Sequence, residues 1–255
     1  MAIGIKNPRE IERMRAAGDV VAICHQRVEA AIGPGVTTAD LDTLVRDTIR
    51  EHGAVSNFFG HQGFQGYICA SINDEIVHGV PGPRALQDGD IISVDIGAIV
   101  EGWHSDSAWT YGVGVIGEDA RRLLIDAEAS LLKGIEEARV GNRTGAIGHA
   151  VESSLAPLRY GIIREYGGHG IGRQMWEEPH IANFGEASGG VLLRAGMVLA
   201  IEPMVTLGGE ATRVLDDNWT IVTRDGSLAA HFEHTVAITA DGPLILTPRL
   251  VSVVH

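Results

Sequence analysis

The sequence predicts an α+β fold built from two similar halves, each combining helices with antiparallel strands. Apolar residues recur at helical spacing in two regions, 8–52 and 118–159, and β-like stretches follow each of them. The pattern LxxGxxIxVD at 86–95 recurs as LxxGxxLxIE at 193–202, with every position offset by 107. No Pro- or Ser-rich linker divides the chain, so we expect one pseudo-symmetric domain, 1–255. The repeated halves are expected at 7–112 and 118–247.

The first half is expected to begin with two helices. Asn7 is a favoured N-cap and Pro8 is tolerated at the first helical position, so the first helix opens there. The Gly-Pro-Gly segment 33–35 stops it. Thr38 is expected to cap a second helix, which ends before Gly53.

Strands are expected after these helices. Residues 67–111 form apolar stretches broken by Gly, Pro and Asp, and the apolar run 91–100 predicts a buried strand. The second half is expected to repeat this order, with a helix over 118–141, a helix that Thr144 caps and that runs to about Arg159, and strands from Tyr160 onward.

The composition is that of a globular protein with an acidic surface. Apolar residues make up 45% of the chain, and 33 acidic against 20 basic side chains give a net charge of −13. Such a chain is unsuited to non-specific nucleic-acid binding, which needs clustered Lys and Arg. No apolar run approaches the ~18 residues of a membrane span, and the first residues lack the apolar core of a signal peptide. We therefore expect a cytoplasmic protein with no nucleic-acid or membrane partner.

Four acidic residues lie in apolar, strand-like surroundings, where an unpaired charge is costly. Asp95 lies within the strand 91–100, and Glu202 repeats this anomaly in the second half. Asp106 and Glu233 follow in the segments HSDSA and HFEHT. The Asp95 and Glu202 strands offer no neighbouring Lys or Arg, which argues against a buried salt bridge. Divalent metal compensates such a cluster, because carboxylates can bridge two ions.

His169, in the segment YGGHGIGR, is the predicted nitrogen ligand of this site. Its flanking glycines let the backbone come close to whatever the imidazole binds. Four carboxylates and one imidazole form an oxygen-rich site that favours Mn, Fe(II) or Co rather than structural zinc. Two ions about 3.5–4 Å apart can share a hydroxide that attacks a carbonyl, which predicts a hydrolase.

These segments resemble the type I methionine aminopeptidases. The resemblance rests on VDIG at Asp95, HSDSA at Asp106, GGHGIGR at His169, AIEPM at Glu202, FEHT at Glu233, INDEIVHGVP around His78 and LDDNWTIVT around Trp219. It runs in order from Ile5 to Leu246. It implies the α+β "pita-bread" fold and a dinuclear metal-dependent aminopeptidase. Such an enzyme removes the initiator Met from nascent proteins whose second residue is small.

The resemblance also implies roles for individual residues. The metal ligands would be Asp95, Asp106, His169, Glu202 and Glu233. Asp106 and Glu233 would bridge two ions, and Glu202 would also accept a proton from the metal-held water. His78 would contact the substrate amide beyond the scissile bond. The pocket for the Met side chain would be formed by Phe58, His61, Phe64, Cys69, Met175 and Trp219.

Trp176 departs from the family pattern, which typically has a second substrate-facing His seven residues after His169. An indole donates one hydrogen bond but neither accepts one nor titrates. By analogy with an oxyanion donor, losing that His costs ~10²–10³ in rate, so Trp176 predicts reduced or altered activity. His180 lies four residues further on, roughly 13 Å along an extended strand, and is expected to be a poor substitute.

Two other functions stay open at this stage. One is a proline-directed peptidase of the same fold, although those relatives usually carry an additional N-terminal domain. The other is a catalytically reduced paralogue that binds peptides, which Trp176 favours and the complete ligand set opposes. The partners that the resemblance implies are nascent polypeptide N-termini, with transient ribosome association, and the chain is expected to be a monomer.

Overall fold

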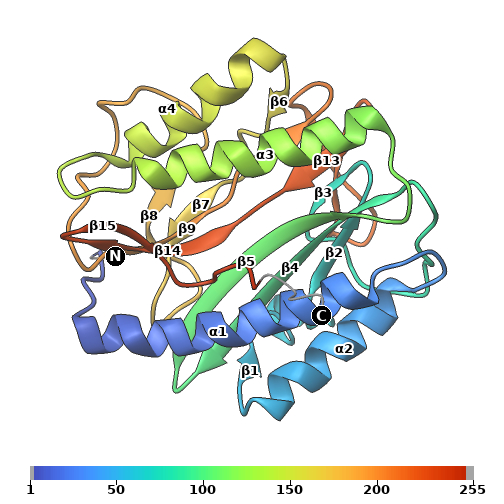
Figure 1. Ribbon diagram of the computed structural model, residues 1–255, viewed down its shortest axis with the longest axis horizontal. Coiled ribbons are helices and arrows are strands. Elements are labelled where there is room, and N and C mark those ends of the chain that lie inside the picture. Colours follow the sequence, from blue (N-terminus) through green and yellow to red (C-terminus); the bar gives the residue numbers. More distant parts are fainter. Residues whose placement is uncertain (1–2, 251–255) are drawn as a thin grey trace.

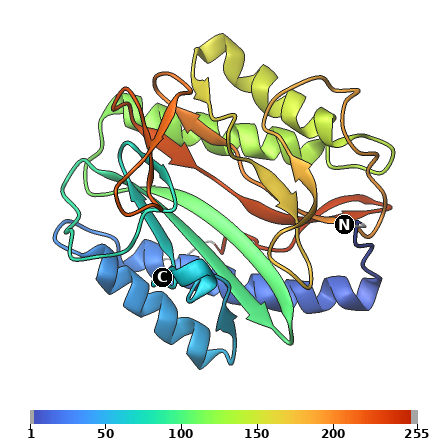
Figure 2. The same ribbon diagram turned by 180° about the vertical axis from the view of Figure 1, so that it is seen from behind.

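The computed structural model describes residues 3–250 and has the predicted α+β architecture. In Figure 1 the pair α3–α4 lies above the pair α1–α2, and α1 and α3 pass in front of strands that lie in front of them in Figure 2. Within the described residues, no helix is long and apolar enough to cross a membrane. The ends of the predicted domain, 1–2 and 251–255, lie outside the described residues. The helices are α1 (Pro8–Ala31), α2 (Thr38–Glu51), α3 (Glu118–Glu136) and α4 (Thr144–Leu155), with 3₁₀ turns η1 (His61–Gly63) and η2 (Ala156–Leu158).

The strands form four antiparallel sheets. A four-stranded sheet has β4 at its centre, paired with β1, β2 and β5, and a five-stranded sheet has the order β15–β14–β9–β7–β8. Two three-stranded sheets have the orders β13–β10–β6 and β11–β12–β3. The strands are β1 (Val55–Ser56), β2 (Cys69–Ile72), β3 (Glu75–Val77), β4 (Ile91–Val100), β5 (Trp103–Gly112), β6 (Gly161–Ile162), β7 (Gly168–Gly170), β8 (Glu177–Ile181), β9 (Val198–Ile201), β10 (Met204–Thr206), β11 (Thr212–Val214), β12 (Ile221–Thr223), β13 (Ala229–His231), β14 (His234–Thr239) and β15 (Gly242–Ile245). The predicted strand 91–100 is confirmed as β4.

In both halves, the residue before the second helix is fixed by the same kind of backbone bridge. Thr37, before α2, forms an isolated antiparallel bridge with Ala85, and Arg143, before α4, forms one with Leu192. These contacts join the start of the second helix of each half to the loop that carries the repeated sequence pattern. The repeat seen in the sequence therefore corresponds to equivalent backbone contacts in space.

The predicted helix caps at Thr38 and Thr144 are wrong. Thr37 is the N-cap of α2, and α4 has no side-chain cap. Thr38 and Thr144 are the first helical residues, and their hydroxyls bond distant loops instead: Thr38 Oγ1 accepts from Gly82 N at 2.8 Å, and Thr144 Oγ1 accepts from Val191 N at 3.1 Å. Each hydroxyl thus ties a helix to its following sheet rather than to its own first turn.

Both helices of the second half end earlier than predicted. The last turn of α3 tightens through a bond from Glu137 N to Gly134 O, and the helix ends before Gly141 is reached. The helix α4 ends at Leu155, where Pro157 cannot donate a backbone hydrogen bond to continue it. By contrast, Asn7 forms the predicted N-cap of α1 in a full capping box.

Helix α1 lies close to β5, the strand that carries Asp106, because Gly18 has no side chain. A Cβ at position 18 would lie 1.9 Å from Leu246 O and 3.3 Å from Ser105 Oγ. Backbone on one side and a strand on the other leave no room for the helix to shift. Gly18 therefore sets the distance between α1 and the site-bearing sheet.

Replacing Gly18 with Ala is expected to destabilise the protein by about 1–3 kcal/mol, because overpacking outweighs the gain in helix propensity. Urea unfolding measures this loss. Gly33→Ala is the matched control, since a Cβ there meets no atom within 4 Å. Equal unfolding midpoints for the two variants would contradict this account of the α1 contact.

Candidate metal centre

Residues of both halves line one cleft with a volume of about 430 Å³. Every residue predicted for the site from the sequence borders it. The candidate ligands are Asp95, Asp106, His169, Glu202 and Glu233, and the candidate substrate contacts are Phe58, His61, Phe64, Cys69, His78, Met175, Trp176 and Trp219. No Lys or Arg is among the described residues that line it.

The register of the four-stranded sheet places two of the acids on one face. Asp95 on β4 is the partner of Ala108 on β5 and of Cys69 on β2. Paired residues of antiparallel strands point to the same face, and so do residues two apart on one strand. Asp106, two residues before Ala108, therefore shares its face with Asp95 and Cys69.

The five-stranded sheet supplies the other ligands by the same rule. His169 on β7 is the partner of Ala200 on β9, which is in turn the partner of Thr235 on β14. Glu202 follows Ala200 by two residues, and Glu233 precedes Thr235 by two. All three candidate ligands therefore point toward the same face of this sheet.

Short distances join the ligand atoms of the two sheets. One ligand atom each from Asp106, His169 and Glu233 lies within 4.8 Å of the others. His169 Nε2 lies 3.6 Å from Glu202 Oε1. The backbone bond from Glu233 N to Ala108 O, at 2.7 Å, fixes the spacing between the two sheets at this point.

The imidazole of His169 is oriented for metal binding. Its Nδ1 lies 2.9 Å from Gly170 O, so Nδ1–H donates to that carbonyl and Nε2 stays free as an acceptor. Burial lowers the pKa of His169 to about 4, which keeps the ring neutral. A neutral imidazole with a free Nε2 is the form that binds a metal ion.

Burial and mutual repulsion raise the pKa values of the four carboxyl groups. Burial raises the pKa of Asp95 to about 7 and that of Glu202 to about 8. Burial followed by repulsion from neighbouring acids raises the pKa of Asp106 and Glu233 well above their ordinary values. Asp95 Oδ1 and Glu233 Oε1 are buried and have no hydrogen-bond partner among the described residues. These orphaned oxygens and the hard donor set fit a divalent cation.

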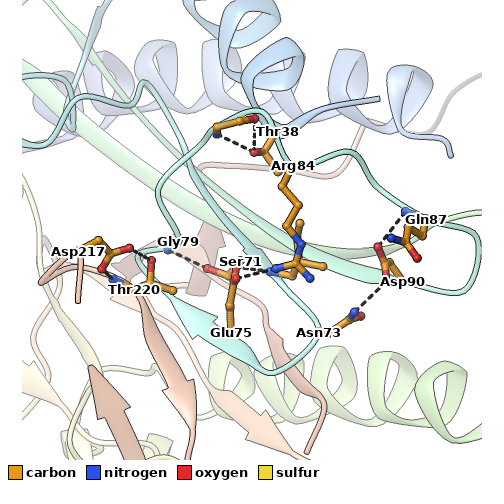
Figure 3. Close-up of polar contacts among 12 residues, drawn as sticks. Thr38, Ser71, Asn73, Glu75, Gly79, Arg84, Gln87, Asp90, Asp217 and Thr220 are labelled. Carbon is orange, nitrogen blue, oxygen red and sulfur yellow. Dashed lines mark hydrogen bonds and ion pairs between the residues drawn. The ribbon is translucent and has the colours of Figure 1, made fainter. Parts of the chain in front are cut away.

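The loop that carries His78 is held from several sides (Figure 3). His78 adopts a left-handed backbone conformation with φ of 60°. The next amide, Gly79 N, donates to Ser71 Oγ at 3.1 Å. Glu75 accepts from Ile72 N at 2.8 Å and binds Arg84 at 2.9 Å. These bonds hold the imidazole at the cleft, where burial lowers its pKa.

An apolar group of residues lines the cleft beside the ligands. Asp217 accepts from the backbone amides of Trp219 and Thr220, a turn that also appears in Figure 3. Trp219 then packs edge-on against Phe64, with ring centroids 5.0 Å apart. The buried members of this apolar group are Phe58, Phe64, Cys69 and Met175.

An ion pair positions the segment that carries Met175 and Trp176. Lys6 Nζ lies 2.7 Å from Glu177 Oε2, and both side chains are largely buried. The other oxygen of Glu177 accepts from Arg173 N at 2.8 Å. Trp176 remains 45% exposed at the mouth of the cleft. Its ring is tilted against that of His61, with centroids 4.6 Å apart, so two predicted substrate contacts meet at the cleft.

Comparison with known proteins identifies the family. A model of metallopeptidase family M24 matches residues 12–240. The chain belongs to this family. Methionine aminopeptidase 1 of Bacillus subtilis is 49% identical over 242 residues, which cover 95% of this chain and 98% of that protein. The predicted resemblance is thereby confirmed.

Solved structures of the family have the same fold. A methionine aminopeptidase of Thermotoga maritima is 42% identical, with a TM-score of 0.95 over 96% of this chain and 99% of that one. A prolidase of Pyrococcus furiosus is 22% identical, with a TM-score of 0.78 over 97% of this chain and 66% of that one, and shares the fold. The predicted pita-bread fold is confirmed, and family membership together with the ligand geometry supports the use of divalent metal.

Two histidines of the cleft were not predicted as site residues. His231 is fully buried, and its Nε2 lies 3.8 Å from Glu202 Oε2 without a hydrogen-bond partner in the described chain. Its spacing of two residues from Glu233 is the signal that places it on the same face. His180 also lines the cleft, although it was predicted to be a poor substitute for a His at position 176. The reason is its register, since it pairs with His169.

Metal binding is expected to release protons near neutral pH. Because the pKa of Asp95 is about 7 and that of Glu202 about 8, the metal-free cleft holds protons that a cation must displace. Titration calorimetry with Mn(II) in two buffers of different ionisation enthalpy measures this release. We expect about one proton or more per chain at pH 7, fewer at pH 9, and an affinity that rises with pH.

The same raised pKa values predict the stability of the metal-free protein. Carboxyls protonated in the folded state but ionised in the unfolded state favour folding at low pH, and this contribution is lost as pH rises from ~4 to ~8. Added metal should therefore raise the melting temperature more at pH 8 than at pH 5. Asp106→Asn is the control. It is expected to diminish both the proton release and the pH-dependent rise in melting temperature on metal binding. Metal binding without proton release would refute this electrostatic account.

Proposed function

We propose that this protein is a metal-dependent aminopeptidase that removes N-terminal Met from peptides. The observation that carries the proposal is the buried carboxylate–imidazole cluster directly beside an apolar pocket in one cleft. The names of relatives that are 45–49% identical over nearly the full chain support it. The carboxylate–imidazole cluster supplies hydrolytic chemistry, and the apolar pocket supplies a place for an apolar side chain.

Asp95, Asp106, His169, Glu202 and Glu233 would hold two divalent ions, and Asp106 and Glu233 are the carboxylates that would be shared between them. The hard donors suit Co(II), Mn(II) or Fe(II). Such ions, when bound, activate water and polarise the carbonyl of the scissile bond. The close approach of ligand atoms from Asp106, His169 and Glu233 supports their sharing of one metal centre.

The chain's own groups bind the peptide and move the proton. Glu202 accepts the proton of the attacking water and passes it to the leaving amino group as the C–N bond breaks. Its Oε2 is the oxygen turned away from His169 and toward His231, which supports a role beyond metal binding. His78 donates to the peptide group beyond the scissile bond from its rigidly held loop.

The apolar group determines which side chain the enzyme accepts. Aromatic rings and a thioether surround the pocket, and polarizable sulfur packs favourably against aromatic edges. Cys69 and Met175 lie with Phe58 and Phe64 in this pocket, and Trp219 covers one side. An unbranched Met side chain fills such a space without leaving a buried polar group unpaired. The ring pair His61–Trp176 lies at the mouth of the cleft, where it would limit the size of the second residue.

The proposed partners are nascent polypeptide N-termini in the cytoplasm, reached by a monomer that associates transiently with the ribosome. The net charge of −13 argues that any ribosomal contact is local rather than a broad electrostatic attraction to RNA. An open cleft mouth, marked by the exposed Trp176, supports access by an extended chain end.

A peptide-binding protein with reduced catalysis is the second candidate, because Trp176 occupies the place where a second substrate-facing His was expected. It differs from the first candidate in turnover and not in metal binding. A proline-directed peptidase is the remaining alternative, because the Pyrococcus furiosus prolidase has the same fold. Peptides with Xaa-Pro ends distinguish that activity.

The chelator-stripped protein is expected to release free Met from Met-Ala-Ser after addition of Co(II), Mn(II) or Fe(II) singly. Quantification of free Met by chromatography measures the rate. Asp106→Asn, which removes one bridging carboxylate charge, should lower kcat by at least ~10²-fold. Metal-dependent cleavage of Ala-Pro-Ser without cleavage of Met-Ala-Ser would favour the proline-directed peptidase. Metal and peptide binding without cleavage of either peptide would favour the peptide-binding protein.

Met175→Ala is expected to raise KM for Met-Ala-Ser about 10-fold with a smaller change in kcat, because it removes apolar contact at a distance from the reacting atoms. Steady-state kinetics measure both constants. Ile125→Ala on the exposed face of α3 is the matched control and should leave both unchanged. A drop in kcat alone would place Met175 outside the pocket for the Met side chain.

A further inference from the structure

The histidine on β8 lies in line with the ligands of the five-stranded sheet. His180 is the partner of His169, which is the partner of Ala200. Because paired residues share a face, His180 points to the same side as His169 and Glu202. The row across the sheet thus continues from the ligands to an imidazole at its edge.

A bulge produces this register. Gly170 is the partner of Glu177, whereas the preceding residue His169 is the partner of His180. Glu178 and Pro179 are therefore extra residues on β8, and a bulge of this kind re-aims the side chains that follow it. Without the bulge, the residue opposite His169 would be a different one.

The wall of the cleft is shaped to admit this imidazole. A Cβ at Gly167 would lie 3.1 Å from His180 Cε1 and 3.5 Å from its Nε2. The ring therefore lies over the bare backbone of Gly167, and both residues line the cleft. His180 is exposed to solvent there, so its ring is accessible to a bound peptide.

The other side chains at this edge cannot serve in the same way. Trp176 can donate one hydrogen bond, but its ring lies against His61 at the mouth. His231 is fully buried behind Glu202, 3.8 Å from Oε2. Of His231 and His180, which both line the cleft, His180 is the one exposed to solvent.

We propose that His180 is a substrate-contacting residue whose imidazole donates a hydrogen bond to the carbonyl oxygen of the scissile peptide bond. The proposal rests on the proposed aminopeptidase function. Negative charge grows on that oxygen as water adds to the carbonyl, and a positioned donor stabilises it more than the ground state. His180 thus performs the task that the indole of Trp176 cannot, and the chain is an active enzyme rather than a reduced one.

Kinetics with Met-Ala-Ser and a fixed metal test the contact. His180→Ala is expected to lower kcat by ~10²–10³ with little change in KM, and His180→Gln, which keeps a donor, to retain at least ~10-fold more activity than His180→Ala. His52→Ala, at the exposed end of α2, is the matched control and should behave as the unchanged protein. Unchanged kcat in His180→Ala would overturn the proposal.

Trp176→His gives an independent comparison. If His180 already supplies the donor, an added imidazole at 176 should raise kcat less than ~10-fold in the otherwise unchanged protein. A gain of ~10²-fold or more would show that the contact is missing in this chain and would overturn the proposal.

A spectroscopic measurement separates this inference from the proposed function. In protein with ¹⁵N-labelled histidine rings, the His180 resonances are assigned by their absence in His180→Ala. They are expected to shift when metal-loaded protein binds the aminophosphonic acid analogue of methionine, whose tetrahedral oxygens imitate the hydrated carbonyl. A shift without Met release in any assay would refute the aminopeptidase function while supporting the contact. Met release without a shift would refute the contact alone.

Discussion

The arrangement of the whole molecule depends on the repulsion among four buried carboxylates, which have to be held close together. Asp95, Asp106, Glu202 and Glu233 converge where burial raises the pKa of each, and the described cleft lining contains no cationic Lys or Arg to offset them. Without a cation, protonation relieves part of this repulsion, and a stiff backbone keeps the carboxyl groups together. Two antiparallel sheets provide this stiffness, and the bond from Glu233 N to Ala108 O joins them beside the ligands. The energy that this arrangement costs is recovered when cations bind.

The internal repeat explains how one chain brings these acids together. The loops before β4 and before β9 are anchored to their helices through equivalent bridges, Thr37 with Ala85 and Arg143 with Leu192. Each half then contributes a strand whose alternate residues face the cleft, and Asp95 and Glu202 occupy corresponding positions. A second carboxylate on a neighbouring strand completes each set. A cleft between two pseudo-symmetric halves therefore brings corresponding residues together, with chemistry concentrated where the halves face one another.

Selectivity and catalysis are divided between neighbouring parts of the cleft. The apolar group around Phe64 and Met175 lies beside the ligands, so an apolar side chain can be buried while its carbonyl is held at the polar end. The segment that carries Met175 depends on a remote anchor, the ion pair of Lys6 with Glu177. His180 lies just beyond this anchor on β8, and Met175 and Trp176 directly precede this strand, so one short segment links pocket, mouth and ligand row. Changes in this strand can therefore alter substrate preference without disturbing the metal ligands.

The sequence by itself determined the elements and the candidate ligands whose signals are local. Asn7 before Pro8 specifies a helix start, and a carboxylate inside an apolar strand, as at Asp95, is conspicuous because burial of charge is so costly. Tertiary structure alone decided what depends on partners across strands. Thr38 bonds a distant loop rather than capping its own helix, and the register of β8 places His180 opposite His169, a pairing that the spacing along the chain does not reveal. The pattern of residues along a short segment indicates its periodicity and burial. The hydrogen-bond register between strands is set by contacts between segments far apart in the chain.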